Sequence, residues 1–156
     1  MKKIINALFL TLFVVCAGCT EPEEMPIPTL EVNYINLDGA WQLTEWRDAP
    51  LAEGTFLYIV LDRKEHTFKI YENMASMYPV LLTGTFELEN DYKVGDIIRG
   101  TYDHENGDWN HEYLVSSLYE ESMVWTATED VTDKQKFERV AEVPAHIVEA
   151  VREVAE

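Results

Sequence analysis

The sequence of 156 residues predicts an all-β fold, an eight-stranded antiparallel up-and-down barrel followed by a C-terminal α-helix. Three observations predict it. Apolar and polar residues alternate in short segments, most clearly at 67–71 and 84–88. Short polar turns separate these segments, and Asn106-Gly107 is the strongest hairpin pattern because both residues accept the positive φ of a type I′ turn. No long helical pattern lies between the strands, which argues against a parallel sheet.

The first residues have the order typical of a secretory signal peptide. A positive start at Lys2-Lys3 precedes an apolar run over 4–15, which is too short to span a bilayer comfortably. The following Ala17-Gly18-Cys19 resembles the bacterial lipobox, although Cys16 stands where that motif usually has leucine. The resemblance implies a signal peptide at 1–18 and a diacylated, palmitate-bearing Cys19 that anchors the protein in the outer membrane. An ordinary secretory signal or an uncleaved anchor is the alternative.

Residues 19–36 are predicted to form an extended acidic tether. The glutamates at 21–24 and the prolines Pro26 and Pro28 keep such a segment from packing. The acidic residues directly after Cys19 also resemble the short export signal of surface lipoproteins in Bacteroidetes. A solvated linker on the periplasmic face is the alternative, so the face of the membrane stays open.

Charge and cysteine content narrow the classes of function. The formal net charge of −17 repels phosphate backbones and anionic headgroups. Nucleic acid is therefore excluded as a partner, and membrane attachment has to come from acyl chains. Both cysteines, Cys16 and Cys19, lie in the signal region, so the folded domain has no disulfide and no cysteine-based metal site.

The barrel domain is predicted over 37–143. Its turn patterns divide it into eight strands, at 39–47, 55–62, 67–72, 80–89, 96–103, 111–118, 122–128 and 134–140. Hairpin connections between successive strands form a meander, and closure of the meander into a barrel removes its exposed edges. A two-sheet sandwich is the alternative.

Residues 144–156 are predicted to form the helix. Pro144 suits a first helical turn, and Ile147 and Val151 begin an apolar face at helical spacing. This face is expected to lie against the outside of the barrel. Trp46 alternates away from the inward face of the first strand and is a candidate for the surface that the helix covers.

Gly39-Ala40-Trp41 resembles the Gly-x-Trp motif that opens the first strand of lipocalin and calycin barrels. In that family an arginine near the end of the last strand packs over the tryptophan, and Arg139 is the matching residue. The resemblance covers residues 37–140. Together with the lipobox, it makes the chain similar to the lipocalin-like lipoproteins of Bacteroidetes. It implies a barrel floor built from Gly39, Trp41 and Arg139. Avidins share Gly-x-Trp but continue with asparagine where Leu43 stands, which argues against biotin binding.

Strand direction predicts the same floor independently. The first strand starts and the eighth strand ends at one end of the meander, so Trp41 and Arg139 meet there. A cation over an indole face is stabilising by about 0.5–2 kcal/mol. The open end then carries the loops 47–54, 73–79, 104–110 and 129–133.

An eight-stranded barrel is wide enough for one small ligand, and methionine and aromatic residues at its mouth suit an apolar molecule. The predicted ligand-binding residues, with Met77 and Trp109 on the outward rim, are Leu43, Tyr58, Phe68, Ile70, Met77, Phe86, Tyr102, Trp109 and Trp125. The alternative is that these side chains fill the mouth.

No catalytic motif is present, so neither an enzyme nor a cofactor is predicted. The stretch 103–112 holds two histidines and four carboxylates, which makes a metal site conceivable. It lacks the spacing of an EF-hand loop and is interpreted as an exposed hairpin tip, so no metal is predicted. Glu45 and Arg47 alternate with Trp41 and are expected either inside the upper barrel or at its wet rim.

These patterns predict a lipid-anchored cell-envelope protein that binds a small apolar ligand in the barrel mouth. The alternative is a non-enzymatic interaction module with a filled barrel that contacts another envelope protein. A void in the middle of the barrel favours ligand binding. A layer filled solidly by Phe68, Phe86, Tyr102 and Trp125 favours the interaction module.

Overall fold

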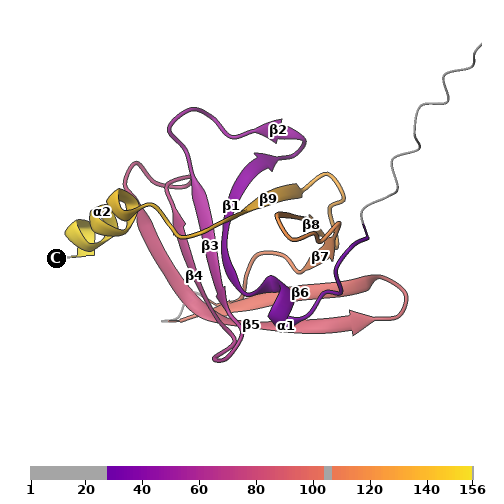
Figure 1. Ribbon diagram of the computed structural model, residues 1–156. Coiled ribbons are helices and arrows are strands. Elements are labelled where there is room, and N and C mark those ends of the chain that lie inside the picture. Colours follow the sequence, from indigo (N-terminus) through magenta and orange to yellow (C-terminus); the bar gives the residue numbers. More distant parts are fainter. Residues whose placement is uncertain (1–27, 104–106, 156) are drawn as a thin grey trace, which may run out of the picture.

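The computed structural model describes residues 28–103 and 107–155 (Figure 1). The predicted signal peptide, Cys19, the first part of the tether and Asn106 lie outside these residues. The helices are α1 (Tyr34–Leu37) and α2 (Ala145–Ala155). The strands are β1 (Gly39–Trp46), β2 (Ala49–Pro50), β3 (Leu57–Asp62), β4 (Thr67–Glu72), β5 (Val80–Asp91), β6 (Gly95–Tyr102), β7 (Tyr113–Ser116), β8 (Ser122–Ala127) and β9 (Lys134–Val140).

The strands form a closed antiparallel barrel. Successive strands pair from β3 to β9, and β1 pairs with both β3 and β9, from Ala40 opposite Val140 to Trp46 opposite Gln135. The two-residue β2 only extends β1 as a hairpin, so eight strands make the wall. The predicted eight-stranded meander is confirmed. In the predicted tight turn, Gly107 has the expected positive φ, 72°.

The residues before β1 close one end of the barrel, the floor. The backbone N–H of Leu30 donates to the carbonyl of Leu118, and Leu30, Val32 and Tyr34 pack against the core. Asn33 caps α1 through its side chain, which accepts a hydrogen bond from the N–H of Asn36. The prediction of an unpacked tether up to Asn36 is therefore wrong for residues 30–36, because their apolar side chains have a floor to cover.

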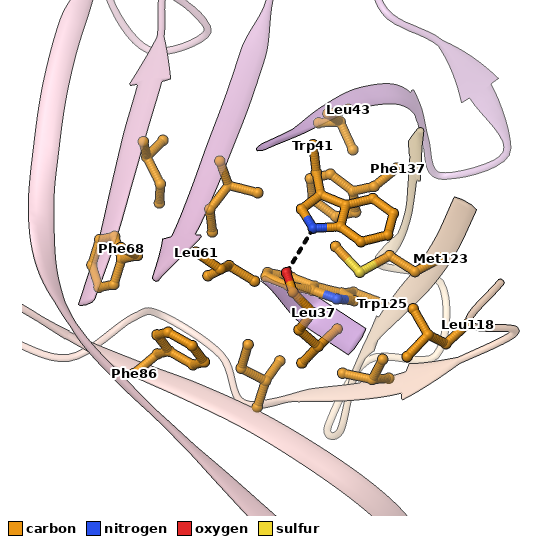
Figure 2. Close-up of a cluster of buried hydrophobic side chains, with 14 residues drawn as sticks. Leu37, Trp41, Leu43, Leu61, Phe68, Phe86, Leu118, Met123, Trp125 and Phe137 are labelled. Atoms are coloured by element: carbon orange, nitrogen blue, oxygen red, sulfur yellow. Dashed lines mark hydrogen bonds between the residues drawn. The ribbon is translucent and has the colours of Figure 1, made fainter. Parts of the chain in front are cut away.

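Alternation along the strands fills the floor half of the barrel. Trp41, Phe68, Phe86, Met123 and Phe137 are each at most 1 % exposed. Figure 2 shows these side chains converging, and the indole Nε1 of Trp41 donates to the carbonyl of Leu37, 2.9 Å away. The short helix α1 thus supplies the acceptor that a buried tryptophan N–H needs.

A β-bulge in β1 reverses this alternation near the mouth. Leu43 lies opposite Phe137, but Glu45 lies opposite Lys136 and Trp46 opposite Gln135, so one extra residue stands between. Trp46 therefore faces the same side as Gln135, into the barrel mouth. Glu45 lies on the outer wall, where Lys136 donates to its carboxylate at 2.9 Å. The expectations of an inward Glu45 and of Trp46 beneath the helix are both wrong for this reason.

Helix α2 lies outside the barrel (Figure 1). Ile147 and Val151 pack against Tyr58 of β3 and Tyr71 of β4, as expected for the apolar face of the helix. Ile59 points inward next to Tyr58, so the prediction that Tyr58 lines the ligand cavity is wrong by one residue of alternation. Within the described residues, neither helix has the length and apolar content needed to cross a membrane.

Candidate functional site

Arg139 closes the barrel floor beneath Trp41. Its guanidinium carbon lies 4.0 Å from the centre of the Trp41 ring. The same guanidinium donates to three backbone carbonyls, those of Asn36, Asp38 and Glu120, at 2.6–2.7 Å. The three residues predicted for the floor lie together. One cation therefore cross-links this end of the barrel.

Gly39 permits this arrangement. Its φ is 114°, a conformation that residues with a side chain rarely adopt, and an added Cβ would lie 3.0 Å from an Arg139 nitrogen. The glycine of the Gly-x-Trp pattern is thus explained by backbone conformation and by the approach of the guanidinium.

The opposite end of the barrel, the mouth, contains a cavity of about 270 Å³. The cavity lies above the packed floor half and opens to solvent. Its walls come from all eight barrel strands and from the loops that follow β4, β6 and β8. The lining residues are Trp46, Leu57, Ile59, Ile70, Glu72, Met74, Ala75, Leu82, Tyr102, Trp109, Asn110, His111, Tyr113, Trp125, Asp133, Gln135 and Phe137.

Trp109 folds back from its loop into the barrel. Its N–H donates to the carbonyl of Gly100 at 2.8 Å, and a Cβ on Gly100 would lie 2.2 Å from the indole ring. The ring centre lies 5.1 Å from that of Phe68 and 5.7 Å from that of Trp125. The prediction of Trp109 on the outward rim is therefore wrong. Gly100, a glycine within a strand, was the sequence feature that indicates such a close approach.

Two indole N–H groups near the cavity have no acceptor among the described residues. The Nε1 atoms of Trp109 and Trp125 are both buried without a hydrogen bond. An unsatisfied buried donor costs roughly 1–3 kcal/mol. The aromatic wall of the mouth is thus packed less favourably than the floor, where Trp41 has its acceptor.

Asp133 is a buried carboxylate at the cavity edge with several partners. It accepts a hydrogen bond from Nε1 of Trp46 at 2.8 Å, and a guanidinium nitrogen of Arg47 lies 3.6 Å away. His111, which also lines the cavity, lies 4.0 Å from Asp133 and bonds to Glu129 through Nδ1. Arg47 stands at the rim with its side chain half exposed, which agrees with the rim alternative of the sequence prediction.

Glu72 is a buried carboxylate of a different kind. It follows Phe68 and Ile70 on the inward face of β4, and it is 8 % exposed. One carboxylate oxygen, Oε2, accepts hydrogen bonds from the backbone N–H groups of Met74 and Ala75. No basic side chain among the described residues forms an ion pair with it.

Two tyrosine hydroxyls in the wall remain neutral well above pH 7. Burial raises the pKa of Tyr113 to about 12, against a smaller opposing effect of the hydrogen bond that its oxygen accepts from Gln135 at 3.2 Å. Burial also raises the pKa of Tyr102, and the negative charge of Glu72 adds to this. Both hydroxyls are therefore available as hydrogen-bond donors.

The structure separates the predicted ligand-binding residues into four groups. Ile70, Tyr102, Trp109 and Trp125 line the cavity. Leu43, Phe68 and Phe86 lie in the packed core, and Tyr58 lies outside under α2. Met77 is 92 % exposed in the loop after β4 and does not line the cavity, because that loop turns its side chain to solvent.

Sequence reasoning missed the polar side of the site, above all Glu72, Asp133 and Gln135. Glu72 had a usable signal, because it continues the inward alternation of Phe68 and Ile70. Trp46 had none, since the bulge that turns it inward has no clear sequence pattern.

Among residues 28–103 and 107–155, no three His, Cys, Asp or Glu side chains gather in a way that could hold a metal ion. Comparisons with protein-family models, with curated proteins and with solved structures find no significant match.

Proposed function

We propose that the barrel binds a small, flat, largely apolar molecule in its mouth cavity. The observation that carries this proposal is the division of one barrel interior into a solid floor half and a hollow, aromatic-walled mouth half. The volume of 270 Å³ lies just below the usual range of ligand pockets, about 300–1,000 Å³, so the ligand is small. The stacking of Trp41 on Arg139 in an eight-stranded meander supports the proposed lipocalin-like relationship.

We further propose that the protein acts at the outer membrane, held there by lipid on Cys19. The lipobox resemblance supports the anchor. The segment from Leu30 to Leu37 packs at the barrel floor, so a tether that ends there leaves the mouth facing away from the membrane. In this orientation the cavity is open to molecules in the surrounding compartment.

The anchor is tested by Cys19→Ala in the native host. We expect the variant to lose acylation and to appear in the soluble fraction, because a surface of net charge −17 has no attraction for anionic lipid. Wild-type protein in the same fractionation is the control. Variant protein that stays with the membrane after a carbonate wash would contradict the proposed anchor.

Ligand binding is tested with the neutral apolar dye N-phenyl-1-naphthylamine, titrated into the Cys19→Ala chain without detergent. Leu82 lines the cavity, whereas its neighbour Leu81 lies on the outer wall opposite Tyr71. We expect Leu82→Trp to fill the cavity and to weaken dye binding at least about tenfold, which corresponds to 1.4 kcal/mol. Leu81→Trp, the matched control, should leave the dye affinity unchanged. Equal affinities of the two variants would overturn the assignment of the cavity as the binding site.

The interaction module remains as a second candidate because apolar side chains are exposed on the mouth loops. Met77, Tyr78 and Val131 are 92 %, 65 % and 76 % exposed. Such residues on one end of a molecule are typical of a contact surface for another protein. Failure of the dye to bind the folded wild-type barrel would favour this second function.

A further inference from the structure

The charge inside the mouth cavity indicates what kind of ligand it takes, and the inference rests on the proposed binding function. We propose that the ligand carries a positively charged amine and that Glu72 is its counter-ion. The inference goes against an anionic lipid, such as a fatty acid, as the occupant.

The charged side chains in the cavity wall are mainly acidic. None of the described residues that line the cavity is a lysine or an arginine, whereas two of them, Glu72 and Asp133, are carboxylates. An anionic ligand would have to bring its charge next to theirs in a site of low dielectric constant. Such a like-charge contact is unfavourable, and its energy is larger inside a protein than in water.

The two carboxylates differ in the groups that balance their negative charge. Asp133 has Arg47 at 3.6 Å and the indole N–H of Trp46 at 2.8 Å. Among residues 28–103 and 107–155, Glu72 is hydrogen-bonded by two backbone N–H groups of its own loop and by no basic side chain, and both N–H groups bond to the same oxygen, Oε2. A carboxylate that is 8 % exposed and that pairs with no cation in the described part of the chain is costly. A cationic ligand group within reach of this carboxylate would supply the missing charge.

Aromatic side chains line the same cavity as the Glu72 carboxylate. Trp46, Trp109 and Trp125 line the same cavity, and indole faces attract cations. A flat aromatic ring on the ligand would stack on the same wall. At long range, the net charge of −17 raises the concentration of cations near the molecule. An aromatic amine therefore matches the cavity in shape, in ring contacts and in charge.

The test compares three molecules that share a phenyl ring and a short chain but differ in charge. Phenethylamine is cationic at pH 7, 2-phenylethanol is neutral, and 3-phenylpropionate is anionic. Each is titrated by calorimetry into the Cys19→Ala chain at pH 7 without detergent. We expect the amine to bind at least about tenfold more tightly than the alcohol, and the propionate to bind most weakly.

Glu72→Gln removes the charge and keeps an amide oxygen that accepts the hydrogen bonds of the Met74 and Ala75 N–H groups. We expect this variant to bind the amine and the alcohol with equal affinity, while its affinity for the alcohol matches that of the wild type. Glu65→Gln is the matched control. It makes the same charge change in the exposed turn between β3 and β4, at the floor end, and it should keep the preference for the amine.

The outcomes distinguish failure of the proposed binding in the cavity from failure of the proposed positive charge on the ligand. If the wild type binds the alcohol or the propionate as tightly as the amine, the cationic ligand is refuted while binding in the cavity stands. If the preference for the amine survives Glu72→Gln, Glu72 is not the counter-ion and the inference fails. If neither the three molecules nor N-phenyl-1-naphthylamine binds, the binding function itself is refuted. The wild-type ranking alone decides the charge of the ligand if Glu72→Gln does not fold.

Discussion

The floor and the mouth of this barrel are built by the same strands and are packed in opposite ways. In β1, Trp41 is fully buried, donates to the carbonyl of Leu37 and stacks on the guanidinium of Arg139. Five residues later Trp46 is 38 % exposed and lines a cavity. In β8, Met123 is fully buried near the floor, whereas Trp125 borders the cavity with its N–H unpaired. The difference indicates that side-chain packing at the floor stabilises the fold, whereas the mouth is packed less completely and retains a cavity.

The largest difference between the two ends is expected for their tryptophans. Trp41→Ala removes a fully buried ring and the surface on which Arg139 stacks, so the free energy of unfolding should fall by about 3–5 kcal/mol. Trp46→Ala removes a partly exposed ring and one hydrogen bond to Asp133, for which we expect about 1.5 kcal/mol or less. Urea denaturation of both variants measures the contrast. Equal losses would show that the floor has no special role in stability.

A smaller loss is expected for Arg139→Lys. Lysine keeps the positive charge but cannot reach three separate carbonyls or stack flat on Trp41. Loss of charged hydrogen bonds should lower the free energy of unfolding by about 1.5–3 kcal/mol. Arg63→Lys is the control, because Arg63 lies at the same end in an exposed ion pair with Asp38, at 3.5 Å. That change should stay within about 0.5 kcal/mol of the wild type, and a loss as large as that of Arg139→Lys would contradict the account.

At the mouth, Gly100→Ala is expected to displace Trp109. The new methyl group would lie 2.2 Å from the indole, so the ring has to move, at a cost of about 1–3 kcal/mol. The Trp109→Leu background should remove most of this cost, because the clashing ring is absent there. A double-mutant cycle measures the coupling, and independent effects of the two changes would contradict the packing of Trp109 on Gly100.

The smallest effect at neutral pH is expected for Tyr113→Phe, which should matter mainly in alkali. The pKa of Tyr113 is raised to about 12, whereas an unfolded tyrosine titrates near 10. The folded state therefore holds this proton more tightly, and its contribution to stability is complete below about pH 10 and is lost as the pH rises towards 12. Denaturation series at pH 8 and pH 11.5 should show a smaller decline for Tyr113→Phe than for the wild type. An equal decline would place the alkali-sensitive group elsewhere.

The floor could be predicted from sequence because its determinants are regular. Strict alternation sets the inward face of each strand, and strand direction brings Trp41 and Arg139 to the same end. These rules depend only on period and parity, which hold over most of the barrel. They also place Phe68, Phe86 and Phe137 inside.

The mouth could not be predicted in the same way because local irregularities decide it. The bulge in β1 moves Glu45 outward and Trp46 inward, and the loop after β6 returns Trp109 to the interior over Gly100. The methionine and aromatic residues of the loops led to the prediction of a ligand contact at Met77 on the rim, but this side chain faces solvent. Glu72 and Asp133 give the cavity wall its negative charge. The sequence does not distinguish them from the many other acidic residues of the chain.

The proposal that the floor is packed for stability and the mouth binds a ligand is tested most directly by a crystal structure. Crystals of the Cys19→Ala chain are soaked with N-phenyl-1-naphthylamine. We expect ligand density in the mouth cavity between Leu82 and Trp125, with Trp41, Arg139 and the floor side chains in unchanged positions. Ligand density on the outer wall or against Met77 and Tyr78, with the cavity empty, would contradict a barrel that keeps its floor for stability and its mouth for binding.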